Sequence, residues 1–224
     1  MPPDPSTSPA PRAIALQALL ACGVAVPAVY FGLQIAAAPF FPDYDWIRNT
    51  ASDLGSTDLP HHRAFNVGVL TLAGVIAFAT AGFWAALTRT GTRAWLAALV
   101  TIALLGMSVQ TAWAGWFPAP DPRHGGHPAF VIAMLATPTL LTLAMWRRSG
   151  RALRTYFALS LLVLAAMVPI MSGLIPFDRG ASAGLLQRIL TATIFIPIGV
   201  AAAKLMQTRR LQLSAGGQPK ENLA

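Results

Sequence analysis

The chain has 224 residues, of which 55% are hydrophobic and only 11% are charged. An average soluble domain has about 25% charged residues, so this composition excludes an ordinary soluble protein. The apolar residues fall in long blocks rather than in short amphipathic periods, which is typical of an integral membrane protein. The single cysteine, Cys22, lies inside one of these blocks and excludes an internal disulfide framework.

The chain begins with a segment rich in Pro, Ser and Thr, residues 1–11, which predicts a disordered tail. The first apolar run follows at residues 12–38. It is longer than the apolar region of a cleaved signal peptide, and Pro39 directly follows the cleavage-like Ala36-Ala37-Ala38. We therefore expect this run to be retained as a membrane span.

Five more apolar runs follow, and each is long enough to cross a hydrocarbon core about 30 Å thick at about 1.5 Å per residue. Short basic turns join the second run to the third and the fourth to the fifth. The sequence therefore predicts an all-α membrane fold, a bundle of six transmembrane helices within residues 12–206, followed by a tail at 207–224. The five later runs are residues 64–87, 94–116, 128–146, 155–175 and 184–206.

The basic residues are divided unevenly between the two sides of this bundle. Eleven of the sixteen Lys and Arg residues lie on the side of the termini and five on the other. Cytoplasmic loops carry the excess of positive charge, so we expect a plasma-membrane protein with both termini in the cytoplasm. The net charge of +8 then faces lipid headgroups. No nucleic-acid motif accompanies it, so the expected partners are membrane lipids and not nucleic acid.

The acidic and histidine residues have the opposite distribution. Six of the eight acidic residues and all four histidines fall in the loops of the extracytoplasmic side. The groups suited to acid–base chemistry or ligand binding are therefore predicted to gather at that face. Each of its three loops also carries an apolar residue, a proline and an aspartate in that order, which suggests three similar helical hairpins. Proline at the end of a span is also ordinary helix termination, so this pseudo-repeat stays open.

The first extracytoplasmic loop contains the short polar stretch Asn49-Thr50-Ala51-Ser52-Asp53-Leu54-Gly55. An ionised group near hydrocarbon is costly without a partner, which makes Asn49, Ser52 and Asp53 candidate ligand-binding residues. The alternative is that Ser52 or Asp53 caps the second span by accepting from its free amides. The sequence leaves both interpretations open.

The second loop contains Asp121, His124 and His127, residue types that bind zinc. The histidines are not one helical turn apart, and Pro128 suits a first helical turn, which places His127 at a cap. We therefore expect no metal and no cofactor, with His124 and His127 as weak candidates only. Asp121 and His124 remain candidates for contact with a ligand.

The last span begins beside Asp178 and contains Arg188 in its first turn, where the helix dipole disfavours a cation. Both are candidate site residues. Arg188 needs an anionic neighbour, which can be a carboxylate or a lipid phosphate. Pairing with Asp53 would relieve the cost of both charges, so we predict an ion pair between Asp53 and Arg188, with Asp178 as the competing partner.

Three motifs, taken in order, resemble a bacterial family of six-span membrane proteins known only as domain of unknown function 998. They are Asn49 to Gly55 with Asn66, then Gly115-Trp116-Phe117-Pro118 with Asp121 and His124, and Gly184-Leu185-Leu186-Gln187-Arg188. The resemblance covers most of residues 12–206. It implies a six-helix integral membrane protein and no established activity.

Three classes of function fit these observations. The first is a membrane protein of unknown activity with a site for a small-molecule ligand or lipid headgroup at the extracytoplasmic face. The second is an intramembrane hydrolase acting on a lipid, in which a metal could assist. The third is a small-molecule transporter, which the absence of charge from the middle of the spans disfavours. The sequence does not decide whether the protein is an enzyme, and it leaves the oligomeric state open.

Overall fold

The computed structural model describes residues 11–216, without the side chains of residues 11–12, 179 and 209–216. Every regular element in this part of the chain is a helix, and six helices are long and apolar enough to cross a membrane. The predicted six-helix membrane fold is confirmed. The six are α1 (Pro11–Ala37), α2 (His62–Arg89), α3 (Ala94–Trp116), α4 (Pro128–Met145), α5 (Arg151–Ser172) and α6 (Arg179–Gly216). Much of the predicted tails, residues 1–10 and 217–224, lies outside the described residues.

Local sequence signals explain where several helices begin and end. Pro128 occupies the first turn of α4, directly after its N-cap His127, because proline has no N–H to lose there. Helix α5 ends at Ser172, three residues before the predicted end of the fifth span, because Gly173 adopts the left-handed conformation (φ 82°) that commonly terminates helices.

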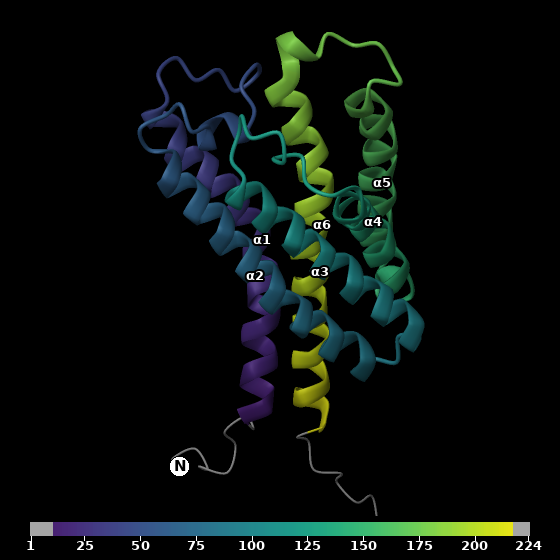
Figure 1. Ribbon diagram of the computed structural model, residues 1–224. Helices are drawn as coiled ribbons and strands as arrows, with labels where there is room; N and C mark the ends of the chain where they lie inside the picture. Colours follow the sequence, from purple (N-terminus) through teal and green to yellow (C-terminus); the bar gives the residue numbers. More distant parts are fainter. Residues whose placement is uncertain (1–10, 217–224) are drawn as a thin grey trace, which may run out of the picture.

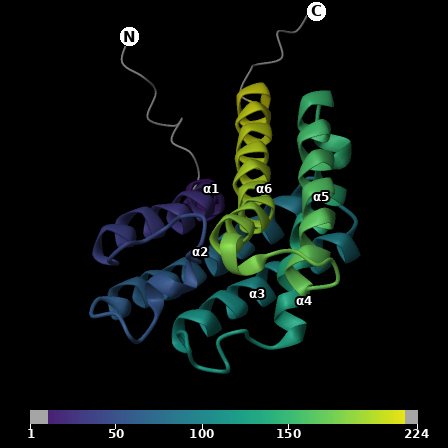
Figure 2. The same ribbon diagram turned by 90° about the horizontal axis from the view of Figure 1, so that it is seen from above.

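The helices run alternately up and down and pack mainly against their neighbours in sequence, from α1 to α4 (Figure 1). Helix α6 closes the bundle, since it contacts α1, α4 and α5 (Figure 2). We call one end of the bundle the loop end; it carries the connections 38–61, 117–127 and 173–178 (Figure 1). The opposite end holds the remaining two connections and both described ends of the chain.

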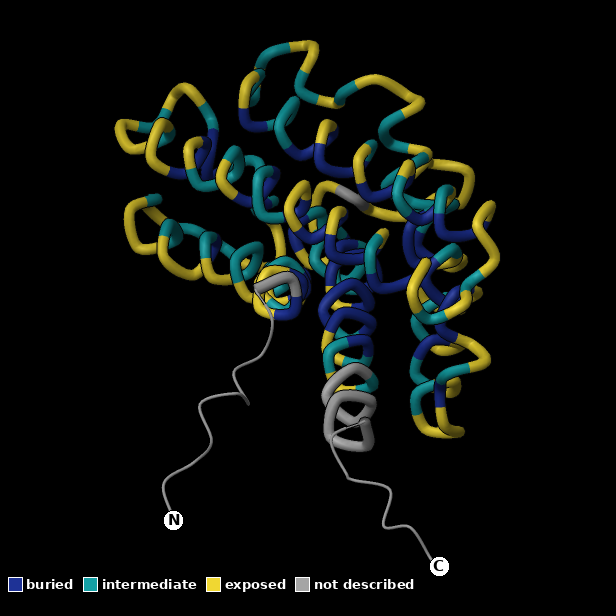
Figure 3. Tube along the Cα trace, turned by 90° about the horizontal axis from the view of Figure 1, so that it is seen from below, coloured by how far each residue is buried: buried dark blue, intermediate teal, exposed yellow. Residues whose placement is uncertain are grey.

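The core lies where α1, α2, α3 and α6 meet. Fully buried Leu20, Ile76, Phe83, Leu104 and Ile198 belong to one continuous cluster there. The outer surfaces of the helices are also rich in large apolar residues, and Figure 3 shows buried segments turned inward and exposed ones outward. An apolar exterior suits a bundle surrounded by lipid, in which helices associate by close packing.

The orientation of the bundle remains a prediction, and cysteine labelling tests it. In a Cys22→Ser background, Gly150→Cys should resist a membrane-impermeant maleimide added to intact cells, because the excess of basic residues keeps that end inside. Asp58→Cys, which replaces an exposed residue of the loop end, should react and serves as the control. Reaction of residue 150 from outside would reverse the predicted orientation.

Candidate functional site

A cavity of about 320 Å³ opens at the loop end, between α1, α2, α3, α4, α6 and the first two loops. Its wall is mainly apolar and includes Leu33, Phe65, Val69, Leu72 and Phe195. The side chains with polar atoms in the wall are Tyr30, Ser52, Asn66, Gln110, Thr111, His124, Gln187 and Thr191. A concave, mostly apolar space with a few polar groups has the character of a small-molecule site.

Ser52 and His124 meet in this wall although they are 72 residues apart in the chain. The imidazole Nε2 of His124 lies 2.9 Å from the hydroxyl oxygen of Ser52, and its Nδ1 lies 2.8 Å from the carbonyl oxygen of Phe117. A carbonyl can only accept, so Nδ1 carries the proton. In the neutral ring Nε2 is then the acceptor, and the hydroxyl of Ser52 donates to it.

Ser52 is presented by a short 3₁₀ helix, η3 (Ser52–Gly55). A reciprocal pair of bonds braces the turn before it: the backbone N–H of Thr50 donates to the Asp53 carboxylate at 2.7 Å, and the N–H of Asp53 donates to the Thr50 hydroxyl at 3.3 Å. The interpretation that Ser52 or Asp53 caps the second span is wrong. Helix α2 begins at His62 with His61 as its N-cap, and Asp53 stabilises its own loop instead.

The start of α6 holds the same loop from the other side. The N–H groups of Gly184 and Leu185 donate to the carbonyls of Arg48 and Ile47, at 3.2 and 3.0 Å. A side chain at Gly184 would overlap the Asn49 carbonyl, so this close approach requires glycine. The loop therefore lies directly on the first turns of the regular part of α6, which follow a break in the helix at Ser182.

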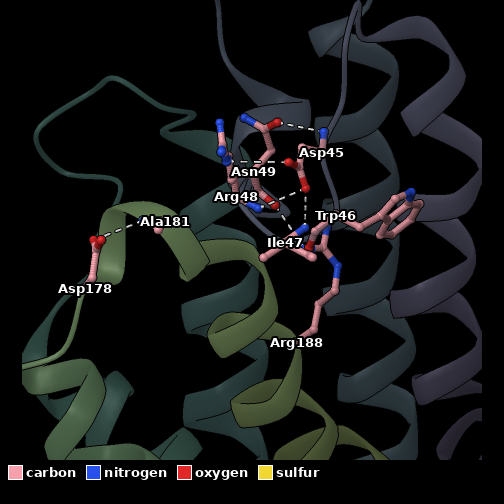
Figure 4. A network of polar contacts seen from close by, with 8 residues as sticks. All are labelled: Asp45, Trp46, Ile47, Arg48, Asn49, Asp178, Ala181 and Arg188. Atoms are coloured by element: carbon pink, nitrogen blue, oxygen red, sulfur yellow. Dashed lines mark hydrogen bonds and ion pairs between the residues drawn. The ribbon is translucent and has the colours of Figure 1, made fainter.

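Arg188 completes this contact (Figure 4). Its Nη1 donates to the carbonyls of Trp46 and Asn49, at 2.7 and 3.0 Å, and its Nη2 donates to the Tyr44 hydroxyl. The guanidinium also lies over the Trp46 ring, 4.6 Å from its centroid. The side-chain carbonyl of Asn49 accepts from the N–H of Asp45 at 2.9 Å, so Asn49 closes the turn of residues 45–49.

The predicted ion pair between Asp53 and Arg188 is wrong. Among the described side chains, the ion pairs within 4.0 Å are Arg48–Asp45 and Arg123–Asp121. Carbonyl dipoles, a phenol and two aromatic faces contact the cation of Arg188, whose Nε is buried without a hydrogen-bond partner among the described residues. The Asp53 carboxylate is satisfied by the Thr50 amide. The sequence showed two charges at similar depth but not these neutral partners.

The loop that carries His124 is braced by Asp121 and Arg123. The Arg123 guanidinium donates to both carboxylate oxygens at 3.0 and 2.7 Å, and these bonds lower the pKa of Asp121 to about 2. Arg123 also stacks on the Phe117 ring, 4.0 Å from its centroid. Asp121 therefore stays ionised through the physiological range, and the pair supports the residue whose carbonyl orients His124.

Gln110 supports the same loop from within α3. Its Nε2 donates to the Gly125 carbonyl at 3.2 Å. A side chain at Gly126, which also has a positive φ of 78°, would overlap the Gln110 amide. The Gln110 Oε1 is buried without a hydrogen-bond partner in residues 11–216, and it belongs to a side chain in the cavity wall. It is a buried acceptor that the described residues leave unpaired.

The other predicted site residues lie outside the cavity wall. His127 is the N-cap of α4, as predicted, and its Nδ1 accepts from the Ala129 N–H at 3.2 Å. Asp178 accepts from the Ala181 N–H at 3.1 Å near the start of α6 (Figure 4). The described part of the chain holds no group of three His, Cys, Asp or Glu side chains that could bind a metal. The absence of zinc stays a prediction for metal analysis.

Of the predicted site residues, the structure brings Ser52 and His124 together in the cavity. Asn49, Asp53 and Arg188 position the first loop, and Asp121 braces the second.

The sequence interpretation missed Gln110 and Gln187 as wall residues. Each is a glutamine within, or near the start of, an otherwise apolar span. A buried amide there needs a hydrogen-bond partner, and this could have marked both residues as candidates. Asn66 and Gln187 were noted only in the resemblance. The Nδ2 of Asn66 donates to the Gly55 carbonyl at 2.9 Å.

The fold defines a multi-pass membrane protein with a polar pair in a cavity at one end of the bundle. The chain belongs to the family described as protein of unknown function (DUF998), which it matches over residues 21–204. No curated protein and no solved structure matches it. The family assignment confirms the resemblance and leaves the chemistry to be argued from the site.

Removing the Arg188 guanidinium tests its role in positioning the loop. Arg188→Gln leaves the carbonyls of Trp46 and Asn49 without their charged donor, and a hydrogen bond to a charged group contributes about 1.5–3 kcal/mol. We expect the free energy of unfolding in detergent to fall by at least about 2 kcal/mol, with lower folded yield. Arg63→Gln, at an exposed position near the start of α2, is the control. Equal stability of the two variants would contradict this role.

Proposed function

We propose that the protein is a membrane-embedded hydrolase or acyltransferase that acts on the acyl ester of a membrane lipid, with Ser52 as nucleophile and His124 as general base. The observation that carries this proposal is the Ser52 hydroxyl donating to a His124 ring whose other nitrogen is held by a carbonyl. A nucleophile, a base and a group that orients the base are the recurring parts of covalent acyl transfer. The excess of basic residues at the opposite end supports an extracytoplasmic location for this site.

The reaction follows from these positions. The Ser52 oxygen attacks the ester carbonyl carbon while its proton passes to Nε2 of His124. The tetrahedral intermediate collapses, the bond from carbon to the alcohol oxygen breaks, and His124 returns the proton to the leaving alcohol. A water molecule, activated by His124 in the same way, then attacks the acyl-Ser52 ester, which releases the fatty acid and restores the hydroxyl. In an acyltransferase a second alcohol replaces the water.

Two observations favour chemistry over binding alone and a metal-free route over a metal-assisted one. A hydroxyl in a mostly apolar wall needs only one acceptor, and here that acceptor is the nitrogen able to take its proton. Both ring nitrogens of His124 are also engaged by protein groups, so metal coordination would have to displace one of them. Binding of a lipid headgroup without reaction is the alternative, and substitution of Ser52 distinguishes the two.

Substitution of the pair provides the test. Ser52→Ala and His124→Gln should each lower hydrolysis of a short-chain p-nitrophenyl ester by at least about 10³-fold, as in other serine nucleophile–base pairs. Labelling by a fluorophosphonate should disappear in Ser52→Ala. Hydrolysis should persist after dialysis against EDTA.

Ser56→Ala and His127→Asn are the matched controls, because both residues lie outside the cavity wall. His127→Asn keeps a side chain that can cap α4. An unchanged rate in folded Ser52→Ala would refute the proposal and leave binding alone as the function of the cavity.

A second cavity of about 250 Å³ lies beside the first and suits the acyl chain. It is formed by the end of α1, η2 (Ala38–Phe40) and the start of α2, and its lining is apolar except for His61. Leu33 and Phe65 belong to the walls of both cavities. The proposed substrate therefore places its ester beside Ser52 and its hydrocarbon chain past Phe65.

Changing Phe65 should alter the preferred chain length. Phe65→Ala removes a shared wall residue and should raise the ratio of long-chain to short-chain ester hydrolysis by about tenfold, since each buried CH₂ contributes about 0.8 kcal/mol. Phe65→Trp should shift the ratio the other way. Phe78→Ala, at an exposed position of the same helix, should leave it unchanged. A ratio insensitive to residue 65 would show that the chain leaves the site by another path.

A further inference from the structure

We infer that the side-chain amide of Gln187 and the backbone N–H of Ser52 form the oxyanion-binding site of this protein. This inference rests on the proposed function, because an oxyanion arises only if Ser52 attacks a carbonyl group. It gives a catalytic role to a residue of α6 that the sequence analysis named only as part of the third motif, without a role. The hydrogen-bond donors around Ser52 carry this inference.

Most backbone amides next to Ser52 are already occupied. The N–H of Thr50 donates to the Asp53 carboxylate, and the N–H of Asp53 donates to the Thr50 hydroxyl. The N–H of Ala51 donates to the Gln187 Oε1, and the N–H of Leu54 donates to the Ala51 carbonyl. The N–H of Ser52 has no acceptor among the described residues. A nucleophile's own backbone N–H is a recurring oxyanion donor, because it lies beside the attacking oxygen.

Gln187 supplies the second donor. Its Oε1 accepts from the Ala51 N–H at 2.6 Å, and since a backbone N–H can only donate, this bond fixes which end of the amide is which. The Nε2 group is attached to the same carbon and has no acceptor within residues 11–216. Gln187 and Ser52 both belong to the wall of the 320 Å³ cavity. The unpartnered donor therefore belongs to an amide that is bonded to Ala51, the residue directly before the nucleophile.

The environment makes these donors effective. Oxyanion donors stabilise a developing charge most strongly in a water-poor, preorganised site. Gln187 is preorganised because it is carried by α6 and its Oε1 is bound to the loop it serves. It is also neutral, so it adds no charge to the apolar wall in the resting state. The neighbouring Arg188 is turned to the carbonyls of Trp46 and Asn49 instead.

Gln187→Glu is the sharpest test. The carboxylate keeps the size of the side chain and an acceptor for the Ala51 N–H, but it replaces the donor with a group that repels an oxyanion. Loss of one such donor lowers kcat by about 10²–10³-fold, and we expect that loss with KM changed less than threefold. Gln207→Glu, an exposed glutamine further along α6, is the matched control.

A phenylboronic acid, which forms a tetrahedral adduct with a serine nucleophile, provides a second readout. Its affinity should fall in parallel with kcat/KM for Gln187→Glu and Gln187→Met, whereas affinity for an uncleavable ether analogue of the substrate should not. Parallel loss of both affinities would mean that Gln187 only maintains the shape of the cavity, and would overturn the inference.

The two proposals fail in different ways. Activity that survives in folded Ser52→Ala refutes the proposed function. Activity that disappears in Ser52→Ala but stays within threefold of wild type in Gln187→Glu refutes the oxyanion role alone. If Gln187→Glu does not fold, the boronic acid and ether affinities of Gln187→Met decide the question.

Discussion

The contact between the first loop and the start of α6 is the constraint on which the rest of the site depends. Two amides of α6 and the guanidinium of Arg188 donate to four carbonyls of residues 46–49. Irregular backbone at the edge of a membrane needs internal partners, because each unpaired carbonyl near hydrocarbon costs several kcal/mol. Here a helix terminus and one cation supply them. The loop gains a fixed position, and Ser52 follows it in the chain by three residues.

The cavity combines this fixed loop with a second one of different design. The loop of His124 is held by the Asp121–Arg123 pair, by the ring of Phe117 and by the Gln110 amide from within the bundle. The two loops also join directly, since the N–H of Thr57 donates to the Ala119 carbonyl at 2.9 Å. Ser52 and His124 therefore meet between two loops, each of which is held by contacts of its own and also bonded to the other. Such rigidity suits a reaction, because nucleophile and base must stay within hydrogen-bonding distance without help from the substrate.

Much of the fold could be predicted from the sequence, and less of the site. Apolar runs of membrane length follow directly from composition, so the six helices were found with ends displaced by a few residues in most cases. The gathering of acidic and histidine residues at one face also directed attention to the two loops that line the cavity. What the sequence could not give was distance: Ser52 and His124 are 72 residues apart, and no period or spacing links two loops that join different helices. The same limit hid the contact of Gln187 with the first loop, a hydrogen bond that its side-chain oxygen accepts from the backbone N–H of Ala51.

The mistaken pairing of Asp53 with Arg188 shows how charges are stabilised at this end of the bundle. Opposite charges at equal depth suggest an ion pair, yet burying such a pair requires desolvating both groups, and that cost can exceed the attraction. In the structure each charge has separate, uncharged partners. Arg188 donates to backbone carbonyls and lies over an aromatic ring, and the Asp53 carboxylate accepts from a backbone N–H. Each charge then holds a different part of the loop. Arg188 fixes the segment before Ser52, and Asp53 stabilises the turn that contains Ser52. An ion pair would have joined the two charges to each other and left the carbonyls of Trp46 and Asn49 without donors. The separation of the charges is therefore what allows one short loop to present a serine to a cavity within a membrane-spanning bundle.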